Sequence, residues 1–140
     1  MEFPKPHPNR QLIDTFQQAF ARRDFTKIRE VMSKKVTWTF AGQHPLAGVK
    51  TGVDEVVEFL EALGGILGTS KLRSKKLIIA ENDKYVLEYQ RIRTRREDHN
   101  NIDQDICICW TIKKGKIVSG KHLFSDLPAI ELFFNRLAGK

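Results

Sequence analysis

The chain has 140 residues, of which 41% are hydrophobic and 29% are charged. This size allows one domain with one hydrophobic core, and the composition is that of an ordinary globular protein, which excludes the disordered and fibrous classes. The formal net charge of +7 is compatible with an acidic partner, with a nucleic acid or with solubility alone, so charge does not choose among them.

Two helices are predicted near the start of the chain. Prolines punctuate residues 1–8, which we expect to be an extended lead to a single domain over residues 1–140. The first helix has Asn9 as its cap and apolar residues at helical spacing, namely Leu12, Ile13, Phe16, Ala19 and Phe20. A second, shorter helix is predicted to start at the capping residue Asp24 and to bury Phe25, Ile28 and Met32.

A strand and a third helix follow. Val36, Trp38 and Phe40 alternate with polar residues, which predicts a half-buried strand with a large aromatic inner face. Residues 41–52 hold three glycines and a proline, so they must turn. The third helix is predicted to start at Val53, to bury Val56, Val57, Leu60 and Leu63, and to stop at Gly64 and Gly65.

From Lys71 onward the hydrophobic period changes to two. Four long strands are predicted over residues 72–81, 84–96, 102–113 and 116–124, with tight turns at 82–83 and 114–115. A last helix begins near Pro128 and buries Ile130, Phe133, Phe134 and Leu137. The order predicts an α+β domain in which helices cover one face of a curved, mainly antiparallel sheet.

Several sequence signatures lie in register with these elements: Phe16-x-x-Ala19-Phe20-x-x-x-Asp24-Phe25, Val36-x-Trp38, Gly42-x-x-Pro45-Leu46-Ala47-Gly48-x-x-x-Gly52, Val57-x-Phe59-Leu60, and Gly115-Lys116-Ile117 with Phe124-x-Asp126. Together they resemble the SnoaL-like family of the nuclear-transport-factor-2-like superfamily, which also holds the ketosteroid isomerases. The resemblance spans nearly the whole chain. It implies a cone-shaped, cystatin-like roll with a deep pocket between the concave sheet face and the helices, and a homodimer formed through the convex face.

The resemblance also argues against one activity. The isomerase branch needs a tyrosine on its first helix and two aspartates on strands, and these positions fall at Phe16, at Trp38 and near Cys107 or Ile108. None of these side chains can act as the general base or complete the oxyanion hole of that branch, so we do not expect steroid isomerase activity.

Two residues are candidates for acid/base chemistry. His122 shares a strand face with Gly120 and Phe124, where SnoaL-like polyketide cyclases often place a polar pocket residue, and imidazole titrates near neutral pH. Asp126 follows the same strand, one residue out of register with an acid of that family. The alternatives are a locally hydrogen-bonded His122, and an Asp126 that caps the last helix.

Aromatic residues are the predicted ligand contacts. Trp38, Phe40, Tyr89 and Trp110 could wall a planar or alicyclic ligand, or could simply fill the core. The predicted lining is completed by Phe16, Phe20, Phe59 and Phe124.

The remaining polar candidates are assigned to the outer surface. On strand 102–113 we expect the even-numbered residues from Gln104 to Ile112 to face inward, which sends Asp103, Asp105, Cys107 and Cys109 outward. The cysteines are expected to be reduced. Arg91, Arg93 and Arg95 either meet solvent or a partner subunit, or Arg91 faces the pocket and pairs with a ligand carboxylate. With Lys71, Arg73, Lys75 and Lys76 they could form a basic stripe, but no nucleic-acid-binding signature accompanies it, so nucleic acid is not an expected partner.

Our leading hypothesis is a cofactor-independent isomerase, cyclase or hydrolase that acts by acid/base chemistry on a mostly apolar organic molecule, with His122 and Asp126 as catalytic residues. The alternatives are a ligand-binding module of the same fold and a basic interaction protein. We expect no metal, because Cys107 and Cys109 lack a second ligand pair at the usual spacing. No apolar run approaches the roughly 20 residues of a bilayer span, and no apolar signal core is present, so we expect a cytoplasmic protein without membrane contact.

Overall fold

The structure, a computed structural model, describes residues 5–139 and consists of four helices and one six-stranded sheet. The elements in chain order are α1 (Pro8–Ala21), α2 (Phe25–Val31), β1 (Met32–Phe40), β2 (Gly48–Thr51), α3 (Val53–Thr69), β3 (Arg73–Glu81), β4 (Tyr85–Arg93), β5 (Asp103–Lys113), β6 (Lys116–Phe124) and α4 (Leu127–Leu137). The predicted α+β class is confirmed.

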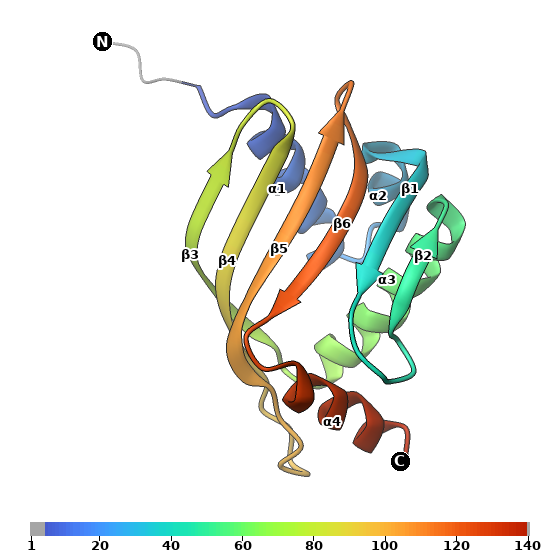
Figure 1. Cartoon of the computed structure of the whole chain (residues 1–140), viewed down its shortest axis with the longest axis vertical. Coiled ribbons are helices and arrows are strands. Elements are labelled where there is room, and N and C mark those ends of the chain that lie inside the picture. The colour runs from blue at the N-terminus through green and yellow to red at the C-terminus, as the bar shows by residue number, and fades with distance from the viewer. Residues whose placement is uncertain (1–4, 140) are drawn as a thin grey trace.

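The sheet has the strand order β2-β1-β6-β5-β4-β3. The pairs β3–β4, β4–β5 and β5–β6 are antiparallel, as the meander predicts. β1 pairs with β6 in parallel, and α3 and four strands lie between them in sequence. Figure 1 shows the sheet from its outer side, with α1 and α3 behind it and α4 across one end. The sheet curls around the helices, so its concave face encloses the core.

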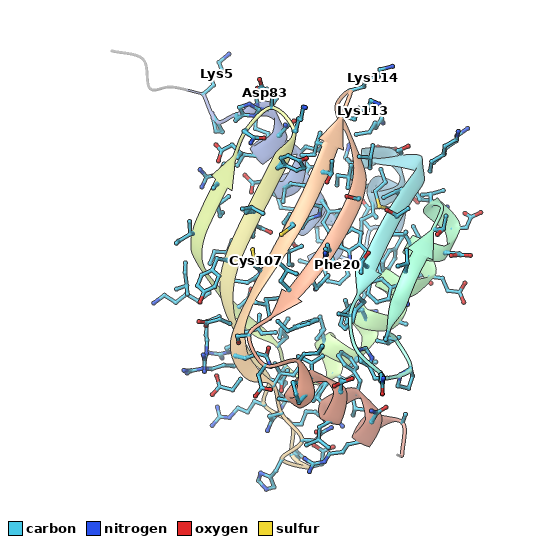
Figure 2. All side chains as sticks on the ribbon, in the orientation of Figure 1. Lys5, Phe20, Asp83, Cys107, Lys113 and Lys114 are labelled. Carbon is cyan, nitrogen blue, oxygen red and sulfur yellow. The ribbon has the colours of Figure 1, made fainter. Side chains whose placement is uncertain are left out.

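Burial alternates along the strands in the predicted sense on β1, β5 and β6. Val36, Trp38 and Phe40 are buried, and so are all the even-numbered residues of β5 from Gln104 to Ile112. Cys107 lies on the opposite, outer face of the sheet, while Phe20 lies among the side chains between sheet and helices (Figure 2). The inner face of these strands therefore meets the apolar stripes of the helices.

Helix boundaries differ from the prediction in three places. The cap of α1 is His7, whose Nδ1 accepts a hydrogen bond from the backbone N–H of Asn9, while the Asn9 side chain donates to the carbonyl of Asn82. The chain is already helical at Pro8, so within the described residues the extended lead is shorter than predicted; residues 1–4 lie outside them. Asp24 caps α2 as predicted, but Met32 opens β1 instead of ending the helix.

The prediction that α3 stops at Gly64 and Gly65 was wrong. The helix continues to Thr69 because these glycines make room for a neighbouring helix instead of ending their own. A Cβ on Gly64 would lie 3.4 Å from the ring of Phe20, so the small residue lets α1 and α3 approach closely. The turning segment after β1 also contains a short strand, β2. The sequence analysis did not predict it, because the glycines in this segment indicated a turn.

Among the residues that the structure describes, none of the helices combines the length and apolar character that crossing a membrane requires.

Candidate functional site

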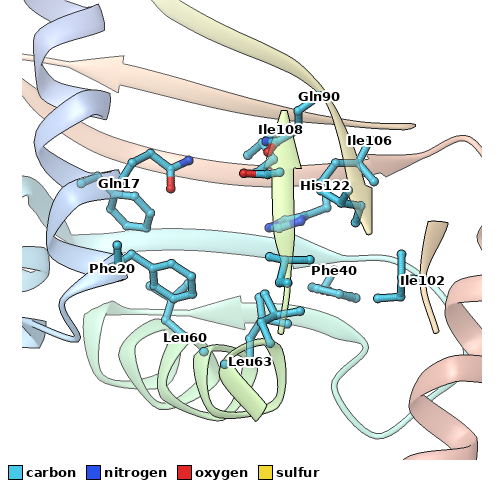
Figure 3. A pocket seen from close by; sticks show the side chains of 18 of the residues that line it. Gln17, Phe20, Phe40, Leu60, Leu63, Gln90, Ile102, Ile106, Ile108 and His122 are labelled. Atoms are coloured by element: carbon cyan, nitrogen blue, oxygen red, sulfur yellow. The ribbon is translucent and has the colours of Figure 1, made fainter. Parts of the chain in front are cut away.

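A cavity of about 530 Å³ lies between the concave face of the sheet and helices α1, α3 and α4. Figure 3 shows Gln17 and Phe20 of α1, and Leu60 and Leu63 of α3, facing Phe40 and His122 of the sheet. The volume falls within the range of pockets that hold small organic molecules.

Aromatic rings form one wall of this cavity. Phe16 stacks on Trp38 with ring centroids 5.6 Å apart and meets Trp110 edge-on at 6.2 Å. The Trp38 indole lies directly over Gly120, where an added Cβ would come within 2.5 Å of the ring. Glycine at position 120 is therefore what allows the indole to lie flat against β6.

Among the residues that the structure describes, His122 is the one histidine that lines the cavity. Its side chain projects inward from β6 and is 8% exposed, with ring centroids 5.0 Å from Phe40, 5.8 Å from Trp38 and 6.0 Å from Phe124. Burial lowers the pKa of His122 to about 4, since these apolar neighbours cannot solvate an imidazolium. The imidazole is therefore neutral at pH 7.

Four buried polar atoms have no hydrogen-bond partner among the described residues: Nε1 of Trp38, Nε1 of Trp110, Nε2 of His122 and Oε2 of Glu88, the last of which lies beside the ammonium group of Lys76. Buried polar groups in folded proteins are almost always hydrogen-bonded, so unpartnered ones beside a cavity indicate where a ligand could bond. The two indoles can only donate, whereas the imidazole donates or accepts according to its tautomer.

The other wall carries a polar group that the sequence analysis missed. Glu88 and Gln90 lie on the inner face of β4, and Glu88 is 0% exposed. The carboxylate of Glu88 accepts a hydrogen bond of 2.8 Å from the Gln17 side chain and lies 2.8 Å from the ammonium group of Lys76. Gln17, Lys76 and Gln90 line the cavity, so this pair gives it a polar edge opposite the aromatic wall.

Six of the eight aromatic residues predicted to contact a ligand line the cavity: Phe16, Phe20, Trp38, Phe40, Trp110 and Phe124. Phe59 does not; it is buried in the core against Phe40, with ring centroids 5.3 Å apart. Tyr89 lies on the outer face of β4, and its hydroxyl donates to Asp105 at 2.6 Å.

Asp126 lies outside the cavity. It is exposed, and its carboxylate accepts a hydrogen bond of 3.1 Å from the backbone N–H of Ala129, which makes it the cap of α4. This is the alternative that the sequence analysis weighed. Among residues 5–139, no acidic side chain lines the cavity with His122.

The arginines of β4 also face outward. Arg91 bonds to Asp103 at 2.7 Å and to Asp105 at 3.3 Å, and Arg93 bonds to Asp103 at 3.0 Å. The Arg91 contact holds the pKa of Asp103 below its usual range, and the Tyr89 hydroxyl, with Arg91, does the same for the pKa of Asp105. These aspartates balance the positive charge of two arginines of the predicted basic stripe. The pairing also places Arg91 away from the pocket.

Within residues 5–139, no three His, Cys, Asp or Glu side chains gather as metal ligands would. Cys107 and Cys109 are free thiols on the outer face, with sulfur atoms 4.0 Å apart. Burial and the neighbouring thiol raise the pKa of Cys107 to about 11, so it is not a reactive thiolate at neutral pH.

Comparison with known proteins identifies the family of this chain. The model of the SnoaL-like domain matches residues 13–120. The uncharacterized protein Rv0034 of Mycobacterium tuberculosis is 28% identical over 116 residues, which are 83% of this chain and 88% of the relative.

Solved structures show the same fold. Bal32a, from a soil-derived mobile gene cassette, has a TM-score of 0.79 at 23% identity and covers 91% of this chain and 96% of its own. TerC, co-crystallized with polyporic acid, has a TM-score of 0.74 at 24% identity and covers 91% and 98%. Other similar structures are described as nuclear-transport-factor-2-like or as having a cystatin-like fold, so the predicted roll is confirmed.

Proposed function

Since this chain belongs to the SnoaL-like domain family, we propose that its cavity binds a small, mostly apolar organic molecule on which His122 acts by acid/base chemistry. The observation that carries this proposal is a single buried imidazole, with an unpartnered Nε2, in an aromatic-lined cavity of about 530 Å³. A strongly shifted pKa in such a cleft is typical of functional sites.

The lowered pKa defines what His122 can do. A neutral imidazole can polarise a ligand carbonyl by donating a hydrogen bond, or accept the proton of an acidic ligand C–H or O–H. Both steps need no cofactor and suit an isomerisation, a cyclisation or a hydrolysis. The indole N–H groups of Trp38 and Trp110 would orient the ligand by donating to its oxygens.

A similar protein supports the class of ligand. TerC has been co-crystallized with polyporic acid, so a small organic molecule is associated with a protein of this fold. The large share of apolar and aromatic residues in the lining here favours a ligand of comparable chemistry.

Binding is tested with the neutral fluorescent probe N-phenyl-1-naphthylamine (NPN). The wild type should enhance its emission saturably, and Ile108→Trp, which fills the cavity, should abolish the enhancement. Val49→Trp adds the same side chain at an exposed residue of β2, outside the cavity, and should leave it intact. Equal binding by both variants would place the probe elsewhere and contradict the proposal.

The same fold could hold a ligand without transforming it, and His122→Phe separates the two functions. This variant keeps an aromatic ring at position 122 but removes the only imidazole of the lining. If the protein is an enzyme, the variant should bind NPN as the wild type does while losing turnover of any compound that the wild type converts. Retained turnover would leave only the binding function.

We also propose that the outer face of the sheet forms a homodimer. Ile78, Leu87, Tyr89 and Leu123 are exposed there. In register, Tyr89 and Leu123 flank Cys107, Leu87 pairs with Cys109, and Ile78 pairs with Tyr89. We call these six residues the outer apolar patch. A contiguous apolar patch on a sheet face, bordered by the Arg91–Asp103 and Arg91–Asp105 pairs, suits a self-complementary interface.

A further inference from the structure

One end of the cavity opens to solvent, and cations from three different elements border this mouth. Arg23 follows α1, Lys71 follows α3, and Lys76 lies on β3. All three line the cavity and are exposed. The deep end, by contrast, is lined by buried apolar residues such as Trp110 and Ile108. The cavity is therefore apolar inside and positively charged at its entrance.

Arg23 is held at the mouth by the glycines of α3. Its backbone is in the left-handed region, with φ of 58°, which ends α1 and turns the side chain toward α3. The guanidinium donates to the carbonyl of Gly64, and its Nη2 would be 3.0 Å from a Cβ on Gly68. The glycine-rich stretch that continues α3 thus creates the space in which the Arg23 side chain lies.

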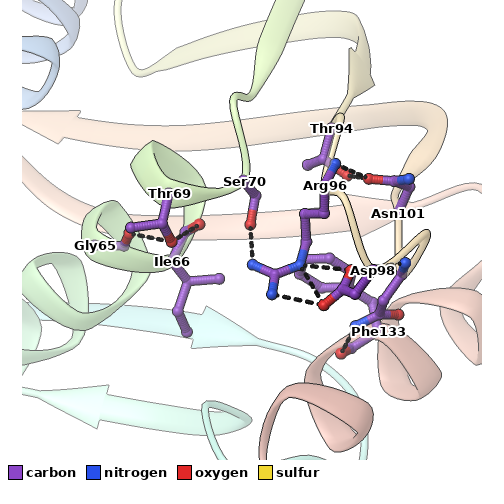
Figure 4. A network of polar contacts seen from close by, with 10 residues as sticks. Gly65, Ile66, Thr69, Ser70, Thr94, Arg96, Asp98, Asn101 and Phe133 are labelled. Atoms are coloured by element: carbon purple, nitrogen blue, oxygen red, sulfur yellow. Dashed lines mark hydrogen bonds and ion pairs between the residues drawn. The ribbon is translucent and has the colours of Figure 1, made fainter.

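Lys71 lines the cavity beside the same glycine of α3, Gly68. Its φ is 54°, and its backbone N–H donates to the carbonyl of Gly68. The preceding Ser70 is fully buried, accepts a backbone hydrogen bond from Arg95 and contacts the Arg96 side chain at 3.2 Å (Figure 4). This network fixes the backbone from which Lys71 projects.

The three cations differ in whether their charge is already balanced. Lys76 forms its ion pair with Glu88, and Arg96, next to the mouth, is paired with Asp98. Within residues 5–139, neither Arg23 nor Lys71 forms an ion pair. Two cations without a counter-ion at the entrance of an apolar cavity favour a ligand that brings an anion to that point.

We propose that the cavity selects an organic acid: an apolar ring body that enters the aromatic interior and an anionic oxygen group that stays at the mouth between Arg23 and Lys71. This rests on the proposed function, since it names the class of molecule that the same cavity binds. It also orients the ligand, because the fixed anion determines which end of the molecule approaches His122.

Two probes that differ by one anionic group test the proposal. NPN is neutral, and 8-anilino-1-naphthalenesulfonate (ANS) has a closely similar ring body with a sulfonate. Each of Arg23→Gln and Lys71→Gln should weaken ANS binding about fivefold, the value of one partly exposed ion pair, and should change NPN binding much less. Lys71→Glu should weaken ANS further. Lys75→Gln removes an exposed cation that is not part of the lining, and it should alter neither affinity.

The outcomes separate the two proposals. NPN should compete with ANS, and added salt should weaken ANS alone. If NPN binds and Ile108→Trp abolishes its binding, but Arg23→Gln and Lys71→Gln leave ANS unaffected, the anion site is overturned and the cavity function stands. ANS that NPN cannot displace would likewise overturn the anion site. If Ile108→Trp leaves NPN binding intact, the cavity function itself fails.

Discussion

The ammonium group of Lys76 lies 2.8 Å from the carboxylate of Glu88, a side chain with no exposed surface on the inner face of β4. Gln17 of α1 bonds to the same carboxylate, so the contact joins β3, β4 and α1 at the edge of the cavity. A buried carboxylate is costly unless it is paired, and here the ion pair is joined by a hydrogen bond from Gln17, 71 positions away in sequence.

Removing the partner of this carboxylate should destabilise the protein. Lys76→Met should lower the free energy of unfolding by about 2 kcal/mol, less than for a fully buried pair because Lys76 is partly exposed. Urea denaturation measures this value. Adding Glu88→Gln to Lys76→Met should recover most of the loss, since the charge is removed and the amide can still accept from Gln17.

Lys75→Met is the matched control, because it removes the same charge from the neighbouring lysine of the strand. Lys75 is exposed and is not part of the ion pair with Glu88. Equal stabilities of Lys76→Met and Lys75→Met would show that the ion pair does not stabilise the fold.

Stability should depend on pH through His122. Its pKa is about 4 in the folded protein and 6.5 in the unfolded chain, so between these values the unfolded state binds more protons. The stabilisation is complete above pH 6.5 and is lost as pH falls toward 4, by about 3 kcal/mol in total. Urea denaturation at several pH values between 7 and 4 measures this slope.

His122→Phe should flatten much of this pH dependence. A remainder is expected from His44, whose pKa is also lowered, mainly by burial. His99→Asn changes an exposed histidine with φ of 63°, a conformation that asparagine tolerates, and should leave the slope as in the wild type. An unchanged slope in His122→Phe would contradict the assignment.

Two glycines should respond in opposite directions to alanine. Gly120→Ala places a Cβ 2.5 Å from the Trp38 ring and should destabilise the protein by about 1–3 kcal/mol as the indole is displaced. Gly65→Ala has only an Arg23 nitrogen at 4.0 Å and should stabilise α3 by about 0.5–1 kcal/mol. Thermal denaturation compares both variants with the wild type, and a stabilising Gly120→Ala would be inconsistent with the close packing described.

The outer apolar patch predicts a dimer in solution. Light scattering after size exclusion at micromolar concentration should give twice the chain mass for the wild type and the monomer mass for Leu123→Glu, because the patch would then bury an unpaired charge. Val49→Glu introduces the same charge at an exposed residue of β2 outside the patch and should remain dimeric. A monomeric wild type would refute the interface.

The sequence by itself determined most of the elements and part of the site. The alternation of Val36, Trp38 and Phe40 and the inward side of β5 follow from a period of two, and the structure bears out both. The family resemblance implied that His122 faces inward, and its side chain is buried. Local pattern is sufficient at these positions because one strand face is clearly more apolar than the other.

Tertiary structure decided β4 and the mouth of the cavity. On β4 the residues Tyr85, Leu87 and Tyr89 look more apolar than Val86, Glu88 and Gln90, yet the second set faces inward. Periodicity shows which residues share a face but not which face is buried. Here the buried carboxylate is satisfied by Lys76 of the neighbouring strand and by Gln17 of α1, which is distant in sequence. Gly64 and Gly65 are a similar case, since two glycines in a row are typical of a helix end. Their role in the middle of α3 depends on Phe20 of α1 and Arg23 of the following turn, which pack beside them and are distant in sequence.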